Sequence, residues 1–198
     1  MEMILDKLQT SYSLSDRDRA YLKFSLKGLF YDISKIMIFF FFFLYMGKTA
    51  AFLWDMALLL LLRGNQGGLH LKHYTTCFLF SLGVLVSSIY FMPGLLEISK
   101  PVMLVALMIC MLVNYYIGPV RNPKCRIEDK GLFARIQVNV FMIVFIYAVI
   151  LYLFPVNYLL TTGFWIIIFH SIQLAIAKSL QYTKERSFHY EKKSTQNA

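Results

Sequence analysis

Charge is scarce in this sequence of 198 residues. Only 16% of the residues are charged, whereas 58% are hydrophobic and 17% are aromatic. A water-soluble fold of this size would leave far too much of that apolar surface facing water. The composition therefore argues against an ordinary soluble domain and predicts an integral membrane protein.

Cysteine is also sparse, with three residues at Cys77, Cys110 and Cys125. An odd number without close spacing argues against a disulfide framework or a tetrathiolate metal site, and free thiols facing a reducing cytosol are expected. We expect no cleavable signal peptide, because the first ~30 residues are charged rather than apolar. The basic segments lack the aromatic interleaving and the recognised folds of nucleic-acid binders. We therefore predict no cofactor, no metal and no nucleic-acid partner.

Long apolar runs predict an all-α integral membrane protein with about six transmembrane helices. Residues 33–62 are too many for one helix across a hydrocarbon core of about 30 Å, so we predict two spans that turn at Gly47 and Lys48. In an alternative with four spans, residues 33–62 form a re-entrant pair. The two clearer pairs of spans are 78–92 with 101–117, joined at Pro93 and Gly94, and 138–154 with 159–177, joined at residues 155–157.

The N-terminal segment, residues 1–31, mixes charged and apolar residues. Ser15 followed by Asp18 is typical of a helix start, and leucines recur after it at helical spacing. The pattern predicts an amphipathic helix that could lie in the headgroup region, although a solvated lead-in helix fits equally well.

The distribution of basic residues predicts the orientation. With six spans and a cytoplasmic N-terminus, the outer connections hold only Lys48 and Lys100 of the 20 Lys and Arg, which leaves 18 on the cytoplasmic side. This asymmetry follows the positive-inside rule. We expect a single domain over residues 1–198 of a multi-pass protein of the bacterial cell membrane. Its amphipathic start, a catalytic segment at residues 63–77 and a basic tail at residues 182–198 would all be cytoplasmic.

Polar and reactive residues gather in residues 63–81, between two apolar segments. This stretch holds one thiol, Cys77, and two histidines, His70 and His73. A thiol at neutral pH needs a neighbouring base to become a good nucleophile. The stretch therefore predicts a cysteine nucleophile site.

His70 and His73 are rival bases for Cys77. On one continuous helix His70 would lie about 10 Å from Cys77 along the axis, beyond hydrogen-bond reach, whereas His73 would be one turn away. Pairing with His70 requires a break in the helix, and Gly67 with Gly68 supplies a tight non-helical turn. The spacing alone leans to His73.

The helix that carries Cys77 into the membrane is predicted to start at Thr75 or Thr76 as N-cap. Cys77 would then lie in the first turn, where the helix dipole favours a thiolate. Two other interpretations stay open. The spacing H-x-x-H-x-x-x-C could bind a metal, although no fourth ligand lies nearby, and Cys77 could be a packing residue near the membrane interface.

Two ionisable residues lie deep in the predicted spans. Asp55 invites a functional interpretation such as orienting the histidine, but we expect it to pair with Lys35 or Lys48 or to lie near water. His170 is expected to be a packed residue with a hydrogen bond.

Four residues, Arg63, Gly68, His70 and Cys77, have the spacing R-x4-G-x-H-x6-C, and Ser81 follows them. This pattern resembles the signature of the accessory gene regulator protein B family, AgrB, which are membrane peptidases that mature bacterial autoinducing peptides. The likeness covers most of the chain, including the amphipathic start and a basic loop before the last pair of spans. It implies Cys77 as the nucleophile and His70 as the base, with supporting roles for the other three residues.

The resemblance also implies a substrate, a short amphipathic precursor peptide with an acidic C-terminal tail. Cys77 would cleave off that tail through an acyl thioester, and a Cys or Ser of the peptide would then close a thiolactone or lactone. The lipid bilayer is the second expected partner, and a homodimer stays open. A non-enzymatic peptide exporter or channel subunit is the alternative class. The basic loop would attract the tail through four residues, Arg121, Lys124, Arg126 and Lys130.

Overall fold

A computed structural model describes residues 16–68, 74–120 and 130–196 of the chain. These residues are almost entirely helical; they contain no strand, only one isolated parallel bridge between Gly67 and Val120. The predicted all-α class is confirmed. The chain divides into two compact units, residues 1–47 and 48–198.

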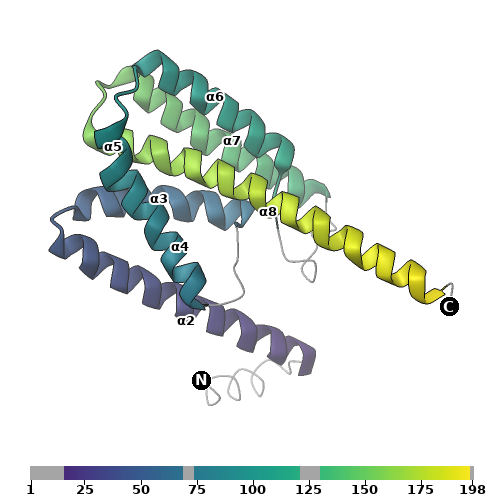
Figure 1. Ribbon diagram of the computed structural model, residues 1–198. Coiled ribbons are helices and arrows are strands. Elements are labelled where there is room, and N and C mark those ends of the chain that lie inside the picture. The colour runs from purple at the N-terminus through teal and green to yellow at the C-terminus, as the bar shows by residue number, and fades with distance from the viewer. Residues whose placement is uncertain (1–15, 69–73, 121–129, 197–198) are drawn as a thin grey trace. The chain divides into compact units, whose positions relative to one another are not determined.

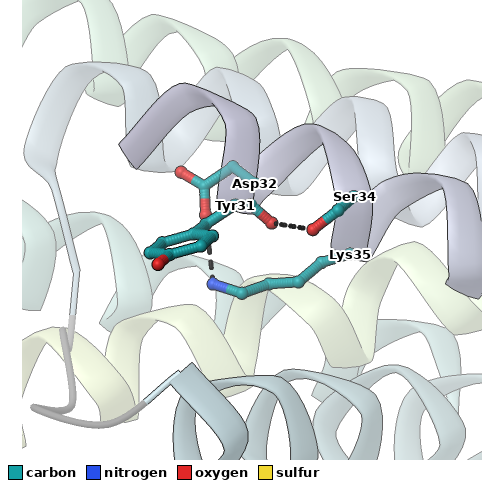
Figure 2. A network of polar contacts seen from close by, with 4 residues as sticks. All are labelled: Tyr31, Asp32, Ser34 and Lys35. Atoms are coloured by element: carbon teal, nitrogen blue, oxygen red, sulfur yellow. Dashed lines mark hydrogen bonds and ion pairs between the residues drawn. The ribbon is translucent and has the colours of Figure 1, made fainter. Parts of the chain in front are cut away.

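The first unit contains helix α2, Asp16–Tyr45. The described part of the amphipathic segment, from Asp16, and the start of the first apolar run form this one helix without a break. Near its middle, the Lys35 ammonium pairs with the Asp32 carboxylate at 3.1 Å, one turn apart, and the Ser34 hydroxyl donates to the Tyr31 carbonyl at 2.9 Å (Figure 2). Helix α2 ends just before Gly47, whose φ of 68° is the left-handed conformation that glycine adopts readily, so the predicted turn is confirmed.

The second unit is built around α8, which contacts α3 and α6, while α7 contacts α6 and α3 (Figure 1). The first half of α8 has fully buried aliphatic side chains at Ile166, Ile167 and Leu174. Helix α4 continues through a short π-helical segment, η1, into α5, and this rod also contacts α8. The bounds are α3 Thr49–Gln66, α4 Tyr74–Val86, η1 Ser87–Phe91, α5 Met92–Leu95, α6 Lys100–Ile117, α7 Lys130–Leu153 and α8 Tyr158–Gln196.

Four helical segments of the described residues are long and apolar enough to cross a membrane. They contain the two pairs of spans that the sequence predicts, and the outward faces of α6 and α7 carry large exposed apolar side chains, such as Met108, Ile109 and Phe145. The chain is therefore a membrane protein. Whether residues 33–62 add two spans stays a prediction. The four segments are Tyr74–Leu95, Lys100–Ile117, Gly131–Leu153 and Tyr158–Thr183.

One predicted boundary is wrong. The helix does not end at Pro93 and Gly94 but continues to Leu95, and α6 begins at Lys100. The proline lies in the first turn of α5, where its missing N–H is tolerated, and the π-helical segment before it shifts the hydrogen-bond register, with the Met92 N–H bonded to the Ser87 carbonyl. The predicted break at residues 155–157 is confirmed, because α7 ends at Leu153 and α8 begins at Tyr158.

Candidate functional site

The candidate site begins where α3 ends, at Gly67. This glycine has φ 77° and ψ −150°, a conformation almost restricted to glycine, and its N–H donates to the Arg63 carbonyl at 2.8 Å. The Val120 N–H donates to the Gln66 carbonyl at 2.8 Å, which ties the end of α3 to the segment that follows α6. The predicted glycine break is thus present and is held from outside the helix.

Arg63 and Gly68 form one packing unit. A Cβ atom on Gly68 would lie 3.3 Å from Nε and 3.6 Å from Cγ of Arg63, so the arginine side chain lies across the glycine. Nη2 of Arg63 donates to Oε1 of Gln173 on α8 at 2.6 Å. The spacing R-x4-G therefore has a physical reason: the glycine leaves room for an arginine that α8 holds in place.

A buried polar cluster lies next to this unit. Nε2 of Gln66 donates to the Asn114 carbonyl at 2.8 Å, and Oε1 of Gln66 lies 3.4 Å from Nε2 of His170. The Asn114 amide donates to the Ser171 hydroxyl at 3.0 Å. All four side chains are buried. The cluster joins α3, α6 and α8 at one level of the bundle, and it confirms His170 as a packed residue with a polar partner.

Sequence reasoning did not find Gln173, Gln66 or Asn114. Each is a neutral amide in a helix end or an apolar run and belongs to no motif. The sequence offers one indication of such residues: a polar side chain on the core-facing side of an apolar helix. A buried amide there needs a hydrogen-bond partner.

Cys77 lies near the start of α4 and is half-buried. The described helix begins at Tyr74, so Thr75 and Thr76 lie inside it and neither is its N-cap. Ser81 follows Cys77 by one helical turn and is buried. The candidate nucleophile, Cys77, therefore lies in the first described turn of α4.

Several predicted site residues lie outside the described residues. These include both candidate bases, so the pairing of either histidine with Cys77 stays a prediction. Lys130 is the first residue of α7, and only its backbone is described. Among the residues that the structure describes, no group of three or more His, Cys, Asp or Glu could hold a metal ion. The residues outside the description are His70, His73, Arg121, Lys124 and Arg126.

Comparison with known proteins gives one family. The family model described as "Accessory gene regulator B" matches residues 1–174. A curated relative from Clostridium beijerinckii, named "Putative AgrB-like protein", is 25% identical over 118 residues, which cover 60% of this chain and 59% of the relative. The chain thus matches less than two thirds of that relative's length. No solved structure matches.

Proposed function

Because the chain belongs to the accessory gene regulator B family, which places it in a quorum-sensing system, we propose that it is a membrane cysteine endopeptidase for a short precursor peptide. The family match supports a role in peptide processing, and the arrangement around Gly67 supports this chemistry. Cys77 is the proposed nucleophile and His70 the proposed base.

One observation carries the proposal, the fixed end of α3. Gly68 is held under Arg63, and α4 resumes at Tyr74, so the intervening segment has only five residues. His70 is four residues before Tyr74, which limits their Cα atoms to about 14 Å apart even in a fully extended chain. The proposed mechanism requires the imidazole of His70 to reach the Cys77 thiol in the first turn of α4, and this spacing permits it.

The chemistry proceeds in two transfers. His70 takes the proton of the Cys77 thiol, and the sulfur attacks the carbonyl at the start of the acidic tail. The peptide bond breaks, the proton passes to the departing amine, and an acyl thioester remains on Cys77. A thiol or hydroxyl of the peptide then attacks that thioester and releases Cys77. With a thiol, one thioester replaces another, so the exchange needs no other energy source.

The substrate class follows from charge. The chain has a formal net charge of +9, and its basic residues include the loop of Arg121, Lys124, Arg126 and Lys130. A cluster of this kind attracts an acidic peptide by long-range electrostatics. The proposed substrate is an amphipathic precursor with an acidic C-terminal tail.

Mass spectrometry of a trapped intermediate tests the proposal. Purified protein incubated with precursor peptide and then quenched in acid is expected to carry one peptide-derived acyl group on Cys77, removable by hydroxylamine. The adduct should be absent from Cys77→Ala and present in Cys110→Ala, which removes a buried thiol of α6. Cleavage without a hydroxylamine-labile adduct would contradict the acyl-enzyme route. Transport of uncut peptide, with neither adduct nor cleavage, would favour an exporter.

Gln173 is expected to matter for cleavage although it lies far from Cys77 in sequence. In Gln173→Leu the packing volume is kept but the 2.6 Å acceptor for Arg63 is lost, so Arg63 no longer stays across Gly68. We expect kcat to fall roughly ten- to hundred-fold through misplacement of the catalytic segment, with little change in KM. Gln173→Glu keeps an acceptor and should restore most of the rate.

The matched control is Gln137→Leu. Gln137 also donates a hydrogen bond from its amide, to the Tyr115 carbonyl at 2.6 Å, but it is on α7 rather than on α3 or α8, which carry Arg63 and Gln173. It should leave the cleavage rate within about two-fold of wild type, as surface substitutions usually do. Equal losses in both variants would mean that Gln173 acts only through general stability.

A further inference from the structure

Asp55 lies at the centre of a second polar site that the proposed peptidase mechanism does not use. Its side chain is fully buried on α3. Oδ2 of Asp55 accepts a hydrogen bond from the Ser88 hydroxyl in η1 at 2.9 Å, and the Thr162 hydroxyl of α8 interacts with the same carboxyl group. The predicted ion pair with Lys48 is therefore wrong, because the Lys48 ammonium lies over the Tyr158 ring, whereas a pair with Lys35 of the first unit stays a prediction. Two elements, η1 and α8, instead bring hydroxyl groups to a buried acid on α3.

The hydroxyl groups at this site are shared between acceptors. The Ser88 hydroxyl is within hydrogen-bond distance of both Asp55 Oδ2 and the Leu85 carbonyl, at 2.9 and 3.0 Å, and it has a single hydrogen to donate. The Thr162 hydroxyl is also 3.1 Å from the Leu159 carbonyl. Each hydroxyl oxygen therefore keeps lone pairs that a cation beside the carboxylate could contact.

The second oxygen of the carboxyl group strengthens this point. Oδ1 of Asp55 is buried and has no hydrogen-bond partner among the described residues. A buried carboxylate oxygen without a partner is costly, by at least as much as a lost hydrogen bond. The site thus offers two carboxylate oxygens and two hydroxyl oxygens without a matching cation.

Among the described residues of the second unit, no side chain supplies that cation. The nearest ammonium group along α3 is that of Lys48, and it lies over the ring of Tyr158 at 4.4 Å and 5.9 Å from the ring of Tyr90, with aromatic faces as its partners. The Tyr158 hydroxyl donates to the Ile89 carbonyl, and the buried Tyr147 hydroxyl of α7 donates to the Leu160 carbonyl. The titratable neighbours on the packed elements are thus phenols and one lysine, and the phenols carry no positive charge.

We propose that Asp55, Ser88 and Thr162 bind one small monovalent cation inside the helix bundle, with Na⁺ and H⁺ as the two sources of that charge. One carboxylate balances one positive charge. Oxygen donors alone suit a hard cation, whereas a tightly held divalent ion normally takes more carboxylates. The π-helical segment that carries Ser88 fits this role, because such segments occur often at functional sites.

The site is separate from the proposed peptidase centre. Asp55 precedes Arg63 by eight residues on α3, a rise of about 12 Å along the helix. The charge asymmetry of the chain predicts that the Arg63 end is cytoplasmic, so the Asp55 end would face the outer half of the membrane. The proposal does not rest on the peptidase function and is tested without a peptide substrate.

Thermal unfolding of the purified full chain in detergent tests the proposal, at constant ionic strength with choline chloride replaced stepwise by NaCl at pH 8. If Na⁺ is bound, the melting temperature rises along a saturating curve by at least about 3 °C. If a proton occupies the site, NaCl has no effect on the melting temperature. In choline chloride, lowering the pH from 8 to 5.5 should then raise the melting temperature of the wild type by about 3 °C more than that of Asp55→Asn. Either response supports the site and identifies the cation.

Variants decide whether the response belongs to this site. Asp55→Asn keeps the shape but removes the charge, and it should lose the response. Ser88→Ala should move the midpoint of an Na⁺ response to at least about ten-fold higher concentration, because one ligand is lost. It should move the midpoint of a proton response to higher pH, because the lost hydroxyl donates to the charged carboxylate. Asp32→Asn is the matched control, because this acid on α2 is exposed and pairs with Lys35.

Two outcomes overturn the proposal. In one, the melting temperature of the wild type responds to neither Na⁺ nor pH. In the other, the wild type and Asp55→Asn show the same response. Should Asp55→Asn fail to fold, an unshifted midpoint in Ser88→Ala overturns it.

Discussion

Cys77→Ala is expected to abolish cleavage of the precursor peptide while the protein remains folded. In the proposed mechanism, the Cys77 sulfur is the protein atom that forms a covalent bond to the substrate. Its loss should therefore reduce the cleavage rate by at least about 10³-fold. Cys77 is only half-buried, and removal of its thiol leaves no large cavity. Cleavage is measured by the release of the acidic tail from a synthetic precursor in proteoliposomes. The melting temperature of each variant is recorded alongside.

Variants of the two histidines complete this prediction. His70→Ala should resemble Cys77→Ala, whereas His73→Ala should retain most of the activity, because the family pattern places the base at His70. The helical spacing alone leans to His73, one turn before Cys77 on a continuous helix. Loss of cleavage in His73→Ala with activity kept in His70→Ala would transfer the role of base to His73. Normal cleavage by Cys77→Ala would refute the cysteine mechanism itself.

The positions of most helices were predictable because their boundaries have local causes. Gly47 ends α2 through its left-handed conformation, and Pro155 stands between α7 and α8. Pro93 was misinterpreted because the sequence does not reveal the π-helical segment that precedes it. Here the shifted register lets Pro93 occupy the first turn of α5, where its missing N–H is tolerated, so the helix continues past it.

Only the part of the candidate site that is contiguous in the sequence could be predicted. The motif from Arg63 to Cys77 is contiguous, so its spacing identified it, and the break at Gly67 followed from residue type. Gln173 could not be predicted as the partner of Arg63. It is 110 residues away, and helical periodicity says which face of a helix is buried but not which helix covers it.

Asp55 shows a related limit. Opposite charges in neighbouring apolar runs suggested an ion pair, but the structure places hydroxyls from η1 and α8 against the acid and turns Lys48 toward aromatic rings. Buried acids are satisfied by whichever polar groups the packing brings to them. Sequence distance carries little information on that choice.

The second prediction of large effect concerns Gly67. In Gly67→Ala the new Cβ would lie 2.4 Å from the Val120 carbonyl oxygen, a backbone atom in a segment that is itself bonded to Gln66. The backbone conformation, φ 77° and ψ −150°, is also one that residues with side chains rarely adopt. Strain and overpacking together should lower the free energy of unfolding by about 3 kcal/mol and abolish cleavage.

Gly64→Ala, three residues earlier, is the matched control for this prediction. Gly64 lies inside α3, and a Cβ there would meet nothing within 4 Å. The same substitution should therefore stabilise the protein, by up to about 1 kcal/mol, because alanine favours the helix. Denaturant unfolding measures the free energy of unfolding of both variants. Changes of opposite sign would show that the protein requires glycine at the end of α3, at Gly67, and not throughout α3. If both variants are as stable and active as wild type, the end of α3 is not held as described. The short connection to Cys77 would then lack a fixed end, and the proposed approach of His70 to Cys77 would lose its structural support.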